Sequence, residues 1–460
     1  MWEDNEFQQV LNRYMTMVSE KRSLFFDVDE FEDIIDYYLD DREFENAYEA
    51  ARLGILQHTD SGELKIKLVH IHLEAGKPNL ALEILNEFSQ IEKKDPEYFL
   101  LKGTSLVQLT NFREAEKCFD HALEASGDDM VEVLINISIA FENARQYKYA
   151  LKYLLMALEL EPDNLSVIYD IAYYYERTSE YPRSISYYNL YLDQDPFSEN
   201  VWYNLGVIYF KTNDWDKALE CYDYAIAINP SYGSAYFNKA NIYANNGNYL
   251  RAIKVYNEFL EIEPKNLQGW SYLGECYEET GNFDKSLEIY KKIISIDNTY
   301  PEGWYGAGLS LMNKDQLTDA VTYILKAIEF DRENPEYWFT LGEIYELQDL
   351  ASEARKCYRN VCMLDPEDRE SWIRLSRLYI DEFEYADALV VLREAYQNNF
   401  NCQDIIFMMS AVYYKLGDEQ AGLSFLEKGL EIGKGGLKLF YSIYPEGVTD
   451  ETIKKLLGKK

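Results

Sequence analysis

The chain has 460 residues, with 81 Asp and Glu against 45 Lys and Arg, so its net charge is −36 at neutral pH. This excess of carboxylates opposes binding to nucleic-acid phosphates or to anionic lipid, because both attract Lys and Arg. No stretch reaches the roughly 18 consecutive apolar residues of a membrane-spanning helix. We therefore expect neither a nucleic-acid partner nor membrane insertion.

Residues 1–27 are predicted to form one amphipathic helix, at about 4–19, that caps the apolar end of the next helices in the chain. They lack the basic and then apolar segments of a secretory signal, so we expect no signal peptide. The run from Asp27 to Glu45 then holds ten carboxylates and one arginine. Its spacing is helical and it has no glycine-centred loop, which favours a solvent-facing or partner-facing helix over a calcium site.

The clearest pattern lies between Glu199 and Tyr232. Positions 4, 7, 8 and 11 of this stretch follow the three-four spacing of one helix face, and positions 20, 24 and 27 repeat that spacing. A proline at position 32 ends the second helix. These residues are Trp202, Leu205, Gly206, Tyr209, Ala218, Tyr222, Ala225 and Pro230. The stretch is therefore predicted to be a pair of helices with small residues where the two approach.

The pattern recurs every 34 residues. Position 20 is small in all twelve windows, and position 11 is Tyr in eight of them. The windows start near residues 28, 62, 96, 131, 165, 199, 233, 267, 301, 335, 369 and 403. The spacing resembles that of the tetratricopeptide repeat, a 34-residue pair of antiparallel helices. The resemblance implies an all-α, right-handed superhelical solenoid of twelve repeats over residues 28–436.

After the last window, a GKGG sequence at 433–436 breaks the period. We predict that residues 437–460 form a C-terminal cap, with a short helix from about Thr449, where a helix-starting residue precedes acids. The alternative is that LKLFYSIYP, at 437–445, docks on a second copy of the chain.

Nothing in the sequence indicates catalysis. Phosphate-binding, dinucleotide-binding and nucleophile motifs are missing, and the repeats leave too few residues for a catalytic domain, so we expect no enzyme activity and no cofactor. His70 and His72 point about 200° apart on a helix, so we expect no metal site. The six cysteines are scattered, which predicts a reduced and therefore cytoplasmic protein.

The resemblance also implies that first helices line the inside of the superhelix, where partners bind as extended peptides or helices. At first-helix positions 2, 5, 9, 12 and 13, the windows hold twenty Asp or Glu and four Lys or Arg. Eight of these acids occupy position 2, where the helix dipole favours them for structural reasons. The remaining excess is still above that of the whole chain, so we predict an acidic groove.

Aromatic rings accompany the carboxylates, and such a surface suits a basic, partly apolar segment because rings stack on Arg and Lys. The alternative for each ring is packing against a neighbouring first helix. The Lys and Arg of a carboxylate clamp are missing around Asn204, Asn238 and Asn241, and only Arg374 and Arg377 offer a basic pair. A series of position-6 asparagines able to bind peptide backbone is interrupted by Asp170. The predicted groove residues are Tyr169, Tyr173, Tyr203, Asn204, Phe237, Asn238, Asn241, Glu275, Glu278, Glu279, Tyr305, Phe339, Glu343 and Glu346.

The sequence thus predicts a non-catalytic scaffold or adaptor whose protein partners carry a Lys/Arg-rich segment. The alternative is a structural protein that assembles into a homo-oligomer through the ends of its solenoid.

Overall fold

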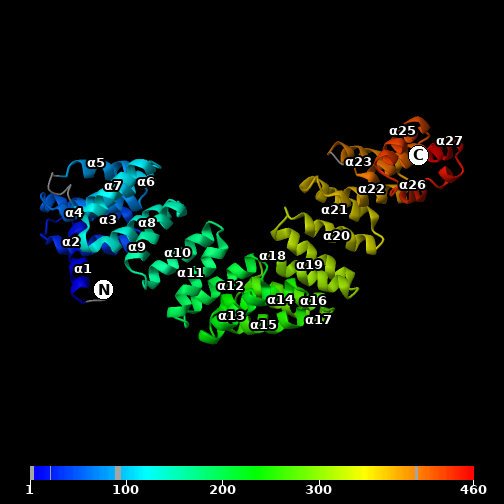
Figure 1. The fold of residues 1–460 in the computed structure, drawn as a ribbon. Helices are drawn as coiled ribbons and strands as arrows, with labels where there is room; N and C mark the ends of the chain where they lie inside the picture. The colour runs from blue at the N-terminus through cyan, green and yellow to red at the C-terminus, as the bar shows by residue number, and fades with distance from the viewer. Residues whose placement is uncertain (1–4, 21, 89–94, 399–401, 460) are drawn as a thin grey trace. The chain divides into compact units, whose positions relative to one another are not determined.

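The computed structural model describes residues 5–20, 22–88, 95–398 and 402–459. Every regular element in these ranges is a helix, which confirms the predicted all-α fold. The chain divides into two compact units, Met1–Ile228 and Asn229–Lys460, and each is described by itself. Within each unit, successive helices pack on one another in chain order (Figure 1).

The first unit begins with a single helix, α1, and continues as consecutive helix pairs. Its helices are α1 (Asn5–Glu20), α2 (Val28–Asp40), α3 (Phe44–Gln57), α4 (Gly62–Glu74), α5 (Pro78–Asn86), α6 (Pro96–Gln108), α7 (Phe112–Ala125), α8 (Met130–Asn143), α9 (Tyr147–Leu160), α10 (Leu165–Arg177), α11 (Tyr181–Gln194), α12 (Glu199–Lys211) and α13 (Trp215–Ile228). A short 3-10 helix, Gly127–Asp129, precedes α8 at the point where the sequence period gains one residue.

The second unit continues the pairs and ends with two short helices. Its helices are α14 (Gly233–Asn245), α15 (Tyr249–Ile262), α16 (Leu267–Glu279), α17 (Phe283–Ile296), α18 (Pro301–Asn313), α19 (Leu317–Phe330), α20 (Pro335–Leu347), α21 (Ala351–Leu364), α22 (Arg369–Asp381), α23 (Tyr385–Gln397), α24 (Gln403–Lys415), α25 (Glu419–Ile432), α26 (Leu437–Ile443) and α27 (Glu451–Lys459). The superhelical handedness and the grouping of these pairs into twelve repeats with two caps stay predictions.

Each pair is closed by a three-residue turn whose second residue has left-handed backbone. The twelve residues with positive φ in these turns are Arg42, Gly76, Thr110, Arg145, Ser179, Asn213, Gly247, Gly281, Asp315, Asp349, Phe383 and Gly417. This conformation reverses the chain after one helix and is costly for residues other than glycine. Eight of the twelve turns nevertheless use another residue, so the packing of the paired helices imposes the turn.

The starts of the first helices are fixed by capping and by proline. The Asn164 side chain accepts a hydrogen bond from the backbone N–H of Val167, and Asn266 does the same for Gly269. Pro301 and Pro335 occupy the first turns of α18 and α20, where a missing N–H costs nothing. Local chemistry therefore restarts the helix after these linkers.

A recurring tryptophan hydrogen bond joins the start of a first helix to the linker before it. The indole Nε1 donates to the carbonyl oxygen six residues earlier. The pairs are Trp202 with Pro196, Trp270 with Pro264, Trp304 with Asn298, Trp338 with Arg332 and Trp372 with Pro366.

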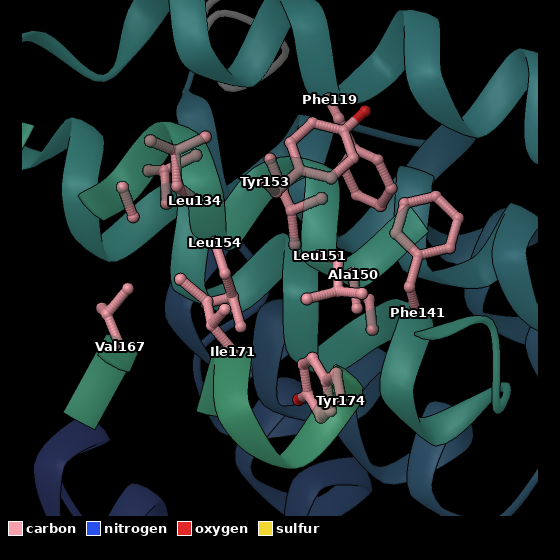
Figure 2. Packing of buried hydrophobic residues seen from close by; sticks show 14 of the residues in the cluster. Phe119, Leu134, Phe141, Ala150, Leu151, Tyr153, Leu154, Val167, Ile171 and Tyr174 are labelled. Carbon is pink, nitrogen blue, oxygen red and sulfur yellow. The ribbon is translucent and has the colours of Figure 1, made fainter. Parts of the chain in front are cut away.

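The core of each unit runs as a ribbon between the helices of successive pairs. Figure 2 shows one part of it, in which Phe119 of α7 and Phe141 of α8 meet Tyr153 of α9. The rings of Phe141 and Tyr153 are stacked, with centroids 5.8 Å apart. Small residues allow this close approach: a Cβ on Gly206 would lie 2.6 Å from the Tyr222 ring.

Both ends of the chain cover apolar surface. In α1, Phe7, Leu11, Tyr14 and Met17 are buried against the first helix pair. At the other end, Phe440 of α26 and Ile453 of α27 are fully buried in a cluster with residues of α24 and α25. The segment 437–445, for which docking on a second copy was one alternative, therefore packs on its own chain through Phe440.

Candidate peptide-binding surfaces

A hollow lies in the first unit, along the successive first helices α4, α6 and α8. Its volume is about 1060 Å³. The apolar part of its lining comes from Leu73, Leu100, Leu101, Val133 and Ile139. Ile139 is 43% exposed, so apolar surface is open to a ligand there. This volume is at the upper end of the ~300–1,000 Å³ typical of ligand sites, and it suits a short segment of another chain.

Carboxylates outnumber bases in the lining of this hollow. The acidic members are Glu74, Asp95, Glu97, Asp129 and Glu132, and the basic ones are Arg42 and His70. His70 Nε2 lies 3.7 Å from a carboxylate oxygen of Glu97. Within the described ranges, Glu74, Asp129 and Glu132 form no ion pair with another side chain. The hollow therefore presents uncompensated negative charge beside apolar surface.

None of the groove residues predicted from the sequence lines this hollow. Glu97 and Glu132 occupy position 2 of their first helices, where the acid was attributed to the helix dipole. Their neighbours in the lining are aliphatic, whereas the predicted groove combined carboxylates with aromatic rings. Three successive windows each place an acid at a position predicted to face the groove, Glu74 at position 13 and Glu97 and Glu132 at position 2, and this was the signal that could have found the hollow.

The predicted residues of the first unit lie on α10 and α12. Asn204 Nδ2 donates a hydrogen bond to the hydroxyl oxygen of Tyr169, 2.9 Å away. Tyr169 also packs edge-on against Tyr188, with centroids 5.9 Å apart. The Tyr203 ring lies 5.9 Å from that of Tyr222. The structure thus joins Tyr169 to Asn204 and gives each of these rings a neighbour inside the chain.

Tyr173 and Asp170 complete this stretch of α10, and both side chains are half-buried. The Tyr173 ring lies 5.8 Å from that of Tyr174, whose hydroxyl donates to Glu142 at 2.7 Å. Burial, with the nearby charge of Glu142 as the smaller cause, raises the pKa of Asp170 to about 6. The acid that interrupts the asparagine series is therefore held where its charge is disfavoured.

In the second unit, α14 carries Phe237, Asn238 and Asn241, all half-buried. The Phe237 ring is 5.2 Å from Phe259 and 5.7 Å from Tyr272 of the next first helix. Asn241 accepts a hydrogen bond from the Tyr256 hydroxyl. Phe237 is thus part of the packing between repeats as well as of the predicted groove.

The next first helix, α16, carries three carboxylates close together, Glu275, Glu278 and Glu279. Glu278 accepts a hydrogen bond from Ser310 of α18 at 2.9 Å, and Ser310 in turn lies 2.8 Å from Ser286. Burial, aided by the charges of Glu275 and Glu279, raises the pKa of Glu278 to about 7 against the hydrogen bonds that lower it. Burial also raises the pKa of Glu275, followed by the charges of Glu336 and Glu279.

Tyr305, on α18, is tied to the following first helix, α20. Its hydroxyl donates to Glu336 at 3.0 Å and lies 3.1 Å from the hydroxyl of Thr340. Its ring also lies 4.7 Å from that of Tyr337. This predicted residue therefore joins two successive first helices, and its place in the groove stays a prediction.

Further along, Arg374 of α22 reaches back to the predicted acids of α20. It pairs with Glu346 at 2.9 Å and Glu343 at 3.2 Å, and with Glu370 of its own helix at 2.9 Å. Its guanidinium lies over the Phe339 ring, 5.5 Å from the centroid. The sequence predicted Glu343 and Glu346 as ligands for a partner's bases, and here they are already partly neutralised by a base of the chain itself.

Three models of one repeat family match the chain. The tetratricopeptide repeat models match residues 199–232, then 100–164, 135–199 and 237–301, and finally 301–334 and 335–368. Together they cover residues 100–368 except 233–236, which is more than half of the chain. The chain belongs to the tetratricopeptide repeat family. Proteins of this family generally mediate protein–protein interactions and are generally non-catalytic.

Several solved structures are similar to parts of the chain. A MamA protein is 20% identical, with 37% of this chain and 93% of that one covered and a TM-score of 0.35. YrrB, described as having an unusual peptide-binding site, is 17% identical over 40% and 95%, with a TM-score of 0.35. A repeat protein from Parabacteroides merdae is 19% identical over 54% and 98%, with a TM-score of 0.39. No curated protein matches the sequence significantly.

Three further findings concern the described residues alone. None of their helices combines the length and the apolar composition needed to span a bilayer. No three of their His, Cys, Asp and Glu side chains are grouped as metal ligands. All six cysteines are free, and four of them are buried.

Proposed function

We propose that this tetratricopeptide repeat protein is a non-catalytic scaffold whose first-helix surfaces bind a basic, partly apolar segment of a protein partner. The observation that carries the proposal is the hollow along α4, α6 and α8, in which five carboxylates and exposed aliphatic surface occur together. Lysine or arginine heads would pair with the carboxylates while apolar side chains cover Leu100 and Ile139.

The acids of α16 supply a second surface of the same character in the other unit. Glu275 and Glu279 lie near Glu278 on the same helix, and Glu278 is half-buried and hydrogen-bonded to Ser310. A cation arriving there would relieve the repulsion among three neighbouring carboxylates. The Arg374 cluster supports the same idea, because one guanidinium over Phe339 with three carboxylates around it is the contact expected of a partner's arginine.

A labelled Lys/Leu peptide tests the proposal, with a Glu/Leu peptide of equal length as its control. Fluorescence anisotropy should show binding of the basic peptide that weakens markedly between about 20 and 150 mM salt, because the contact is electrostatic. Binding of both peptides alike, or binding indifferent to salt, would contradict the proposal.

Two pairs of charge-reversing substitutions identify which of the two surfaces binds the peptide. Glu97→Lys with Glu132→Lys should weaken binding if the hollow holds the peptide, and Glu275→Lys with Glu278→Lys should do so if α16 holds it. The matched control is Glu159→Lys with Asp193→Lys, which changes the net charge equally at exposed positions of the second helices α9 and α11. An equal loss in all three variants would show that only the overall charge matters.

A further inference from the structure

The last residues of the chain reverse the charge of the rest. Residues 434–460, which we call the basic end, contain six lysines and three acids, whereas the whole chain carries −36. Lys434, Lys438, Lys454 and Lys455 are exposed. Lys454 lies 3.8 Å from Glu451, and no ion pair is formed by Lys434, Lys438 or Lys455 with any described side chain.

The basic end is also held in shape. Ile453 of α27 is fully buried together with Phe440 of α26, so the helix is anchored on the last repeats. The next two residues, Lys454 and Lys455, are exposed, and Leu456 and Leu457 are half-buried. The two leucines pack against the same cluster as Ile453, so this short helix holds its exposed lysines on a fixed support. Such a basic surface suits the carboxylates that line the hollow of the first unit.

We infer that the basic end of one copy docks in the acidic hollow of a second copy, with Lys454 and Lys455 facing Glu97 and Glu132. The inference rests on the proposed function and names a second copy of this chain as one partner. Charge complementarity carries it: two chains of −36 repel unless a contact is locally complementary, and here exposed lysines meet a hollow lined by five carboxylates, of which Glu132 has no ion-pair partner among the described residues and Glu97 has only His70, 3.7 Å away.

The two surfaces are different, so the contact is head-to-tail. A head-to-tail contact leaves a free hollow on one copy and a free basic end on the other, and assembly continues until a ring closes or the chains are exhausted. The segment 437–445 keeps its packing on its own chain, because Phe440 is buried there and the docking surface is the lysine face beyond it.

Sedimentation velocity of the full chain tests the inference over a hundredfold range of concentration. We expect the average mass to rise with concentration at about 20 mM salt and the association to be lost near 500 mM, because ions screen the contact. Lys454→Glu with Lys455→Glu should weaken self-association at least tenfold, and so should Glu97→Lys with Glu132→Lys. Lys291→Glu with Lys292→Glu, two exposed lysines of α17, is the control and should leave it unchanged.

Mixing the two charge-reversed proteins is the decisive experiment. In each variant, like charges face each other at the two mutated pairs of positions, so it should stay monomeric alone, whereas the mixture pairs lysines with glutamates at these positions again and should associate. Circular dichroism verifies that both variants keep the helical fold. A mixture that stays monomeric would overturn the inference.

Three other outcomes also count against it. A wild-type chain that is monomeric at every concentration in low salt overturns it, and the Lys/Leu peptide then shows by itself whether the proposed function survives. Association that the lysine variant leaves intact places the contact elsewhere. A change of sedimentation coefficient that the lysine variant causes at every concentration would mean that the basic end folds back on its own chain.

Discussion

The indole nitrogen of Trp202 lies 2.9 Å from the carbonyl oxygen of Pro196 and donates a hydrogen bond to it. The same bond recurs at four other tryptophans at the same place in the repeat, so it fixes how each linker enters its first helix. Pro196 lies in the linker between α11 and α12, so this bond ties the linker to α12.

Replacing Trp202 by Phe should therefore loosen this entry. We expect a loss of about 0.5–1.5 kcal/mol, the usual net worth of one hydrogen bond, with some further loss of packing on Tyr224. Faster hydrogen–deuterium exchange in α12 and a lower urea midpoint would show it. The control is Trp215→Phe, since Trp215 is 41% exposed and no such bond is found for it in the described chain. Equal effects at both sites would contradict the role given to the bond.

The turn residue Phe383 offers a gain of stability. It has φ 63° and is 76% exposed, so its ring contributes little while its backbone is strained. Left-handed backbone destabilises the folded state by about 1–2 kcal/mol for a non-glycine residue, and glycine removes this strain. Glycine also makes the unfolded chain more flexible, which offsets about 0.5–1 kcal/mol of the gain. Phe383→Gly should thus stabilise the protein by roughly 0.5–1 kcal/mol in urea unfolding.

The reverse change supplies the control for this turn. Gly281 has φ 72° in the corresponding turn of another repeat, and Gly281→Ala should destabilise by about 1 kcal/mol. If both substitutions moved the urea midpoint in the same direction, backbone strain would not be the cause.

A close contact between helices makes the opposite prediction for Gly206. Alanine is the better helix former by about 1 kcal/mol, yet its Cβ would meet the Tyr222 ring at 2.6 Å. Overpacking of this kind costs about 1–3 kcal/mol, so Gly206→Ala should destabilise overall. Gly458→Ala in α27, where nothing lies within 4 Å, should show the propensity gain without the clash.

The repeats were predictable from the sequence because the packing of the helices requires particular residue types at a fixed spacing. Small residues such as Gly206 and Ala218 recur at 34 residues, since two helices can approach closely only there. The left-handed residue of each turn was not predictable, because eight different windows place a side chain such as Phe383 or Thr110 where glycine is expected.

The surface was predicted less well than the helices. Spacing assigns a residue to a helix face, but it does not say which neighbouring side chain forms an ion pair with it. Glu343 and Glu346 were predicted as groove residues for a basic segment of a partner, and Arg374, 28 residues beyond Glu346, pairs with both. Glu74 and Glu132 are unpaired because no base of the described chain lies within ion-pair distance of them, and only the three-dimensional contacts reveal this.

Glu278 should make stability fall as pH rises. Burial raises its pKa from 4.5 to about 7, so the folded protein holds a proton over a range in which the unfolded chain has released it. The contribution to stability is full below pH 4.5 and is lost as the pH rises through about 7.

Glu278→Gln removes this titration and keeps an oxygen for Ser310. In urea unfolding, the variant should gain about 1–3 kcal/mol over the wild type at pH 8 and nothing below the ordinary carboxyl range. Glu261→Gln, at an exposed position of α15, should change little at any pH. A difference between wild type and Glu278→Gln that is the same at pH 5 and pH 8 would rule the titration out.

Removing Arg374 should strengthen binding of a basic peptide to the second unit. In Arg374→Gln, Glu343 and Glu346 lose the guanidinium that now lies 3.2 and 2.9 Å away, and the Phe339 ring loses the cation above it. A lysine or arginine of the peptide can then take the same place. Each contact of this kind contributes about 0.5–1 kcal/mol at a partly exposed site, so affinity should rise roughly threefold to tenfold.

Anisotropy with the Lys/Leu peptide measures the gain, and Arg369→Gln is the matched control because Arg369 is an exposed base at the start of the same helix. The substitution also removes a bridge between α20 and α22, so a modest loss of stability should accompany the tighter binding. Because peptide affinity should rise while stability falls, the two measurements distinguish the role of Arg374 in blocking the binding surface from its role in joining α20 and α22. Lower stability without tighter binding would show that Arg374 only holds two helices together, whereas tighter binding shows that it occupies the place of a partner's base.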